Sequence, residues 1–178
     1  MKRGINMEDI KVLINEQQLQ KRVDEIARQI EEEYKGKEIT LICILKGSVF
    51  FTVDLARKIR GDVKLEFIRV SSYNDGTESS GEIKMKLDLK DSIQGKDVIV
   101  IEDIIDTGRT LSYLIEYLKM KKPNSVKLCT LLDKPERRVQ KVKVDYTGFQ
   151  IPDKFVIGYG LDFDERYRNL PYVGYIET

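Results

Sequence analysis

The segment Asp97–Leu111, DVIVIEDIIDTGRTL, decides the expected fold. It begins with a run of apolar, β-branched residues, which predicts a buried strand. The run ends at the acidic pair Glu102-Asp103, and a third acid, Asp106, follows three residues later. Apolar residues at helical spacing come next and stop at Pro123, which predicts a helix directly after the strand. A buried strand joined to a helix is the building unit of a parallel α/β sheet.

Strands and helices alternate along the rest of the chain. Further strands are predicted over Ile39–Leu45, Val63–Val70, Ser125–Leu132 and Phe155–Tyr159, and the strict alternation of Ile83–Lys90 predicts a strand with one exposed face. Helices are predicted over Asn15–Tyr34 and, with Ser48 as N-cap, over Ser48–Ile59. We therefore expect an α/β fold, one domain over residues 1–178, whose mainly parallel twisted sheet is flanked by helices. Functional loops should gather at the carboxyl ends of its strands.

Composition excludes several classes of protein. The 178 residues carry 31 basic and 30 acidic side chains, a formal charge of +1, which argues against a nucleic-acid-coating role. No membrane partner is expected, because the longest apolar run, Leu41–Leu45, is far too short to span a bilayer. The N-terminus lacks the apolar core of a secretory signal, so a cytoplasmic location is expected. Cys43 and Cys129 lie in apolar runs without metal-binding spacing, which predicts buried, reduced thiols.

The chain contains no His. This absence excludes nucleophilic catalysis by Ser-His or Cys-His pairs and zinc sites built on His. Any acid–base step must therefore use Asp, Glu, Lys, Tyr or a bound metal, which directs attention to the three acids of the opening segment.

The turn Thr107–Thr110 predicts a phosphate site. Backbone N–H groups at a helix N-terminus lack intrahelical partners and favour an anion, and Gly108 allows close approach. Neighbouring carboxylates would repel a phosphate unless Mg²⁺ or sugar hydroxyls stand between them. The alternative is a simple helix cap by Asp106 or Thr107 with solvated acids. The turn is not a Walker loop, and Gly158-Tyr159-Gly160 does not continue into a dinucleotide-binding fingerprint.

The opening segment resembles the phosphoribosyl-diphosphate signature of the type I phosphoribosyltransferases. Four other segments resemble the hypoxanthine-guanine (6-oxopurine) branch of that family: LKGS at Leu45–Ser48, SSYNDG at Ser71–Gly76, LLDKPERR at Leu131–Arg138, and Phe155–Pro171. The resemblance covers nearly the whole chain in the family's order. It implies a type I phosphoribosyltransferase core with a small hood formed by residues 1–14 and 152–178.

The resemblance implies roles for the residues of the opening segment. Glu102 and Asp103 would hold the ribose hydroxyls and Mg²⁺. Asp106 would be the general base that accepts the N7 proton of a purine while N9 attacks the anomeric carbon. The 5′-phosphate would lie on Thr107, Gly108, Arg109 and Thr110; the family often has Lys in place of Arg109.

The remaining segments imply contacts to the base and to pyrophosphate. Lys134 would donate to the oxygen at C6 of the base, Phe155 would stack on the purine, and Val156 would meet its edge. Read without the family, Lys134 is a surface lysine and the other two are core residues. Pyrophosphate contacts are implied for Lys46, Gly47, Asp162 and Arg168, with a cis peptide before Lys46 and a second Mg²⁺ near Asp162. Ser72 and Tyr73 would belong to a mobile loop over residues 71–81; the alternative is a plain hairpin.

The implied reaction is purine salvage by a pentosyltransferase. Phosphoribosyl diphosphate and hypoxanthine or guanine would give IMP or GMP and pyrophosphate, in a homodimer or homotetramer. One alternative is a regulator that binds phosphoribosyl diphosphate without catalysis, disfavoured by the +1 charge and by Asp106. Another is a different acceptor: Lys134 disfavours adenine, whereas xanthine shares the 6-oxo group and stays open.

Overall fold

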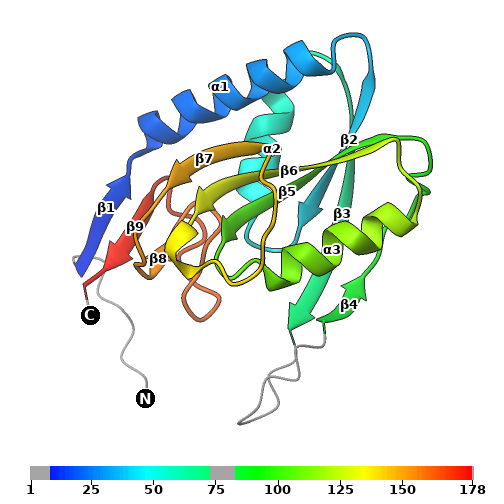
Figure 1. Ribbon diagram of the computed structural model, residues 1–178. Coiled ribbons are helices and arrows are strands. Elements are labelled where there is room, and N and C mark those ends of the chain that lie inside the picture. The colour runs from blue at the N-terminus through cyan, green and yellow to red at the C-terminus, as the bar shows by residue number, and fades with distance from the viewer. Residues whose placement is uncertain (1–8, 73–82, 178) are drawn as a thin grey trace.

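A computed structural model describes residues 9–72 and 83–177 (Figure 1). Its main sheet has six strands in the order β4-β3-β2-β5-β6-β7. The strands are β2 (Glu38–Ile44), β3 (Asp62–Ser72), β4 (Ile83–Leu87), β5 (Asp97–Ile105), β6 (Ser125–Asp133) and β7 (Tyr146–Gln150). All neighbours run parallel except β4, which lies antiparallel to β3 at one edge. The expected α/β fold with a mainly parallel sheet is confirmed.

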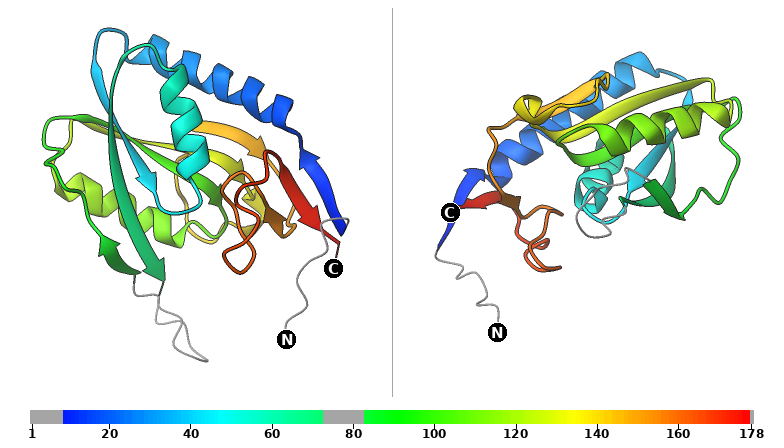
Figure 2. Two further views of the ribbon diagram at one scale, coloured as in Figure 1. Left: turned by 180° about the vertical axis from the view of Figure 1, so that it is seen from behind. Right: turned by 60° about the horizontal axis from the view of Figure 1, so that its bottom comes forward.

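Helices cover both faces of this sheet (Figures 1 and 2). On one face lie α1 (Glu16–Glu33) and α2 (Val49–Lys58), and on the other lies α3 (Arg109–Met120). Strand β5 contributes to both cores by simple alternation: Ile99 and Ile101 pack with α1 and α2, whereas Val98 and Val100 pack with α3. The central strand is therefore buried on both sides, and its carboxyl end is held rigidly.

A second, antiparallel sheet joins the two ends of the chain. It consists of β1 (Ile10–Ile14), β9 (Val173–Ile176) and β8 (Val156–Ile157), in that order. In Figure 1 the arrowheads of β5 and β6 point toward the loop that leaves this sheet after β8. Strands β1, β7 and β9 were not predicted from the sequence, because none has a long apolar or alternating pattern.

Three details differ from the sequence prediction. Strand β5 continues to Ile105, so Glu102 and Asp103 lie within it rather than after it; Glu102 pairs with Thr130 of β6. Ser48 stands at the N-cap of α2, as predicted, but its side chain makes no capping hydrogen bond, because its hydroxyl donates to the Ile44 carbonyl at 2.7 Å. The strand predicted over Phe155–Tyr159 shrinks to two residues, because φ is positive at residues 158–160.

Both cysteines are buried and unpaired, as predicted. Burial raises the pKa of each thiol, so neither is a reactive thiolate. None of the helices in the described part of the chain combines the length and apolar character that a membrane span needs.

Candidate active site

The turn between β5 and α3 has the geometry of an anion-binding helix N-terminus. Gly108 stands at the N-cap with φ 80°, and no side chain caps the helix. The first helical bond is donated by Ser112, to the Gly108 carbonyl, so the preceding amides have no helix partner. A cavity of about 120 Å³ opens here, lined by residues that include Asp106, Thr107 and Thr110. The contact that resembles a side-chain cap is that of Thr107 Oγ1, which lies 3.5 Å from the Arg109 nitrogen, long for a hydrogen bond.

Gly108 is required at this position for two reasons. Its left-handed backbone disfavours residues with a Cβ. A Cβ there would also lie 2.7 Å from the Gln140 carbonyl oxygen. The segment after β6 packs so closely because Val139 and Gln140 both donate to the Thr107 carbonyl, at 3.0 and 2.9 Å. The segment that follows β6 therefore holds the β5–α3 turn in place.

Glu102 and Asp103 are partly withdrawn from water at the end of β5. Burial raises the pKa of Glu102 well above its ordinary value, and the neighbouring Asp103 charge raises it further. Burial also raises the pKa of Asp103 to about 6, although the Ile104 amide and the Arg168 guanidinium act in the opposite direction. Two adjacent desolvated carboxylates of this kind favour a bound cation.

The acidic pair fits the oxygen ligands that Mg²⁺ prefers. Within residues 9–72 and 83–177, no group of three or more His, Cys, Asp or Glu side chains is arranged to hold a metal. Mg²⁺ is commonly held by one or two carboxylates together with substrate oxygens and water, so a pair is a sufficient protein contribution.

The loop after β2 lies directly over Asp103. The Leu45–Lys46 peptide bond is cis, as the family resemblance implied. A Cβ on Gly47 would fall 1.5 Å from Asp103 Oδ2, so any other residue there would displace the Asp103 carboxylate. A Cβ on Gly160 would lie 1.9 Å from the Gly47 carbonyl oxygen, which shows how closely the loop after β8 crosses the first.

Charged side chains tie the loop after β8 to this region. Lys46 Nζ lies 2.8 Å from Glu165 Oε2. Arg168 donates from Nη1 to the Gly160 carbonyl at 2.7 Å, and its Nη2 lies 2.9 Å from Asp162 Oδ1. Two separate sequence segments are therefore brought together, the first with Lys46 and Gly47 and the second with Asp162 and Arg168.

A third group of predicted residues lies at the end of β6. Lys134 is buried, its backbone donates to the Ile105 carbonyl at 2.9 Å, and its Nζ lies 3.3 Å from Asp153 Oδ1. Arg137, in the short 3₁₀ helix η2 (Pro135–Arg137), places Nε 2.8 Å from Asp106 Oδ1. The predicted general base and the predicted base-recognition lysine are thus neighbours.

The two predicted base-contacting residues after Asp153 differ in exposure. Phe155 is 50% exposed and meets Phe163 edge-to-face, with ring centroids 5.8 Å apart. Val156 is buried and pairs with Tyr175 of β9. An exposed aromatic ring at a sheet edge is available to stack on a ligand, which a core residue would not be.

Two predicted residues are not placed in the site. Ser72 ends β3 opposite Ile83, but its side chain lies outside the described part of the structure, as does Tyr73. Conversely, the sequence did not single out Arg137, Asp153, Phe163 and Glu165. Arg137 stands in a quoted motif beside Arg138, and no sequence signal tells the two apart: Arg138 instead pairs with Asp133.

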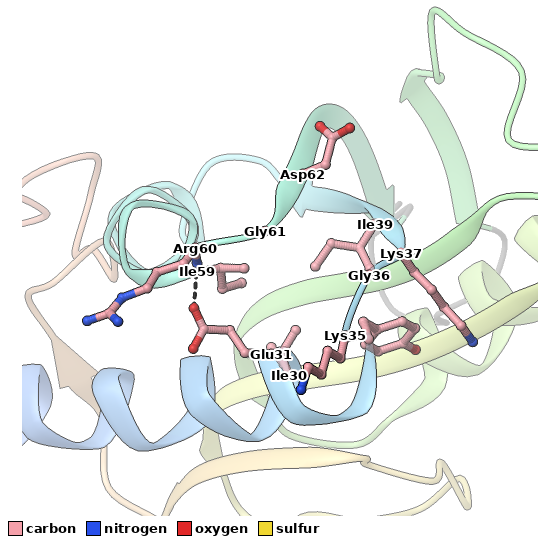
Figure 3. A pocket seen from close by; sticks show the side chains of 11 residues that line it. Ile30, Glu31, Lys35, Gly36, Lys37, Ile39, Ile59, Arg60, Gly61 and Asp62 are labelled. Atoms are coloured by element: carbon pink, nitrogen blue, oxygen red, sulfur yellow. Dashed lines mark hydrogen bonds between the residues drawn. The ribbon is translucent and has the colours of Figure 1, made fainter.

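An apolar cavity lies at the opposite end of the sheet (Figure 3). Its volume is about 220 Å³, and it opens at the amino ends of β2 and β3, where α1 and α2 terminate. Ile30, Ile39 and Ile59 line it, and Glu31 on its rim accepts from the Arg60 amide. None of the predicted site residues lines this cavity.

Comparison with known proteins agrees with the geometry. Residues 11–164 match the family model described as phosphoribosyl transferase domain, and the chain therefore belongs to the phosphoribosyltransferase family. Within the family it is 48% identical to the hypoxanthine-guanine phosphoribosyltransferase of Bacillus subtilis, over 94% of this chain and 93% of that protein. A crystal structure of a hypoxanthine-guanine phosphoribosyltransferase from Bacillus anthracis is 50% identical with a TM-score of 0.90, covering 94% and 98% of the two chains.

A third relative is longer. The bifunctional protein TilS/HprT of Listeria monocytogenes is 50% identical over 94% of this chain, which spans only 26% of that protein.

Proposed function

We propose that the protein transfers the 5-phosphoribosyl group from phosphoribosyl diphosphate to N9 of hypoxanthine or guanine, giving IMP or GMP and pyrophosphate. The observation that carries this proposal is the meeting of three features: an uncapped helix N-terminus, a desolvated acidic pair, and a glycine loop packed on Asp103. The first suits a phosphate, the second a sugar with a cation, and the third a second phosphoryl group. The 48% identity to a curated enzyme of this activity supports the same reaction.

In the proposed reaction N9 attacks C1′ of the ribose as the bond from C1′ to pyrophosphate breaks. The N7 proton passes to the Asp106 carboxylate, and Lys134 donates to the oxygen at C6. Because adenine carries an amino group there, a buried lysine opposite it would leave an unmatched donor. Phe155 would stack on the purine, and Val156 would offer its backbone to the purine edge.

The sugar and phosphate roles follow the same geometry. The amides and hydroxyls of Thr107–Thr110 bind the 5′-phosphate, and Glu102 and Asp103 hold the ribose hydroxyls. These two carboxylates would also hold Mg²⁺, which when bound neutralises charge on the pyrophosphate. Lys46, Gly47 and Arg168 bind the leaving pyrophosphate, with Asp162 at its edge. Ser72 and Tyr73 would serve the exclusion of water from the reaction, as the resemblance implies; Tyr73 and the side chain of Ser72 lie outside the described residues.

We further propose that residues 1–14 and 152–178 act as a hood and that the protein assembles as a homodimer or homotetramer. Support for assembly comes from Phe50 and Val53 on α2 and Leu65 and Phe67 on β3, each more than 40% exposed. Leu65 and Phe67 point to the α2 side of the sheet, because the alternate residue Ile68 packs on the α3 side. Such an apolar surface is typical of an interface between subunits.

The variant Phe67→Glu tests this surface. It should shift the mass measured by light scattering to that of a monomer, and an unchanged mass would exclude this surface. The proposed location is the cytoplasm.

The test is a spectrophotometric assay with phosphoribosyl diphosphate and Mg²⁺, offering hypoxanthine, guanine, xanthine and adenine separately. We expect turnover of hypoxanthine or guanine, loss of turnover with EDTA, and its recovery with added Mg²⁺. If the protein binds phosphoribosyl diphosphate but converts none of the four bases, the enzyme proposal is wrong and a binding regulator takes its place. Preferential turnover of xanthine or adenine would instead reassign the acceptor.

A further inference from the structure

Four alternating charges connect the two sides of the proposed purine site. Asp106 Oδ1 lies 2.8 Å from Arg137 Nε, and Arg137 Nη1 lies 3.1 Å from Asp153 Oδ2. The second oxygen of the same carboxylate, Asp153 Oδ1, lies 3.3 Å from Lys134 Nζ. The order is therefore carboxylate, guanidinium, carboxylate, ammonium.

The ends of this chain match one edge of a 6-oxopurine. The N7 and O6 positions of guanine lie side by side on that edge. In the proposed function, which this inference rests on, Asp106 accepts the N7 proton and Lys134 donates to O6. The two interior residues, Arg137 and Asp153, touch neither atom in that scheme, yet they fix where both end groups stand.

Each interior residue pairs with the oppositely charged end group beside it: Asp153 with Lys134, and Arg137 with Asp106. The Lys134 side chain is only 10% exposed, and the Asp153 carboxylate 3.3 Å from its Nζ gives this buried polar group a partner that orients it. A general base must be ionised and must keep one oxygen free for the substrate. Arg137 Nε lies 2.8 Å from Asp106 Oδ1, a buried oxygen, whereas the Asp106 side chain as a whole is 43% exposed, so Oδ2 can face the purine.

Backbone hydrogen bonds hold the segments that carry three of these four charged side chains, Asp106, Lys134 and Arg137, against one another. Lys134 donates to the Ile105 carbonyl, next to Asp106, and Val139 donates to the Thr107 carbonyl on its other side. The adjacent arginine is not available to replace Arg137, because Arg138 pairs with Asp133. Arg137 therefore stands opposite Asp106 by virtue of the fold, and its planar guanidinium can hold two carboxylates at once, which a lysine cannot.

We propose that Arg137 and Asp153 are positioning residues that couple recognition of the base at Lys134 to proton acceptance at Asp106. Loss of either link should misplace both end groups together. An ordinary half-exposed ion pair would contribute little and would act independently of its neighbours.

The test is a double-mutant cycle on the full-length protein with Arg137→Gln, Asp153→Asn and the double variant. For each, kcat/KM for hypoxanthine and KM for phosphoribosyl diphosphate are measured. We expect each single variant to lose roughly tenfold in kcat/KM for hypoxanthine, with KM for phosphoribosyl diphosphate unchanged within about twofold. The double variant should be no worse than the poorer single variant, because both changes break one chain. Arg137→Lys should stay impaired, because one ammonium cannot bridge both carboxylates.

Matched controls come from α1, far from the site. Asp24 pairs with Lys58 at 2.8 Å and is 46% exposed, much like Asp153, and Arg28 on the same helix is exposed. Asp24→Asn and Arg28→Gln should leave both kinetic constants unchanged.

Each outcome decides the question. Wild-type kinetics in Arg137→Gln or Asp153→Asn, or losses that multiply in the double variant, would overturn the coupling while the proposed function stands. Equal losses for base and phosphoribosyl diphosphate, together with a lowered Tm, would mean a merely structural role and would also overturn it. If the wild type converts no base at all, the proposed function itself fails and the inference falls with it.

Discussion

The two ends of the main sheet differ in the chemistry of the side chains that line them. At the amino ends of β2 and β3 the structure has an apolar cavity of about 220 Å³, lined by isoleucines from α1, β2 and the end of α2 (Figure 3). At the carboxyl ends the cavity in the β5–α3 turn measures only about 120 Å³. Yet this smaller one lies at a helix N-terminus without a side-chain cap, and its lining includes Glu102, whose pKa is raised by burial.

The difference teaches that chemistry, rather than cavity size, locates this site. Parallel strands place the helix N-termini, with their free amides, at the carboxyl end of the sheet and the helix C-termini at the opposite end. Anionic substrates are therefore attracted to only one end. Substitutions at the carboxyl end should lower activity without destabilising the fold, and substitutions at the amino end should destabilise the fold with little effect on activity.

The largest effect is expected for Asp106→Asn. Removing a general base typically costs ~10²- to 10⁴-fold in rate, because an amide cannot accept the N7 proton. We expect kcat to fall by that factor while Tm changes little, since Asp106 is on a half-exposed turn. Steady-state kinetics and a thermal melt on the same preparation measure both. A variant that keeps more than a tenth of wild-type kcat would contradict the assigned base.

A second, smaller loss is expected for Lys134→Met. This change keeps the length and apolar stem of the side chain but removes the donor to O6. We expect kcat/KM for hypoxanthine to fall roughly 100-fold, because a site built on a buried polar contact loses discrimination when the contact is removed. The ratio of hypoxanthine to adenine turnover should fall too. An unchanged ratio would show that another group selects the base.

The acidic pair should give the protein a specific pH dependence. Because the pKa of Asp103 is raised to about 6, its carboxylate gains a proton as the pH falls through 6 and can then no longer bind a cation. The apparent Mg²⁺ affinity, measured by activity at fixed phosphoribosyl diphosphate, should fall roughly tenfold per pH unit below that point.

The raised pKa of Asp103 also affects the stability of the folded protein. Lower pH weakens Mg²⁺ binding but should increase this stability. Above its folded-state pKa this carboxylate is charged in a desolvating site, so it lowers the stability of the folded protein. As the pH falls below 6, the penalty disappears. Asp103→Asn should therefore melt a few degrees higher than the wild type at pH 8, with the difference shrinking at pH 5. Equal melting temperatures at pH 8 would mean that Arg168 and the Ile104 amide fully compensate the burial.

At the amino end the smallest effect on activity is expected. Ile59 is buried beside the apolar cavity, and Ile59→Ala should cost ~2–4 kcal/mol in the free energy of unfolding, measured with urea. Its kcat should stay within about twofold of the wild type. A selective loss of activity without loss of stability would break the contrast between the two ends.

Much of the core could be predicted from the sequence because its signals are local. The apolar run of β5, the helical spacing after it and the Asn15–Tyr34 helix depend on neighbouring residues, and all three are confirmed. Strands β1, β7 and β9 could not be predicted because they are short and are held by partners distant in sequence. The exact end of β5 depends on its pairing with β6, which no local pattern reveals.

The class of fold could be inferred from local sequence patterns, as could a turn suited to phosphate, and the resemblance to a family supplied the residues expected in the site. Only the tertiary structure decided which of these residues meet. It set Gly47 against Asp103 and Gly160, and placed Arg137 rather than Arg138 opposite Asp106. The physical reason is that such contacts join segments separated by tens of residues. Their geometry is fixed by sheet pairing and packing, not by the preferences of the residues themselves.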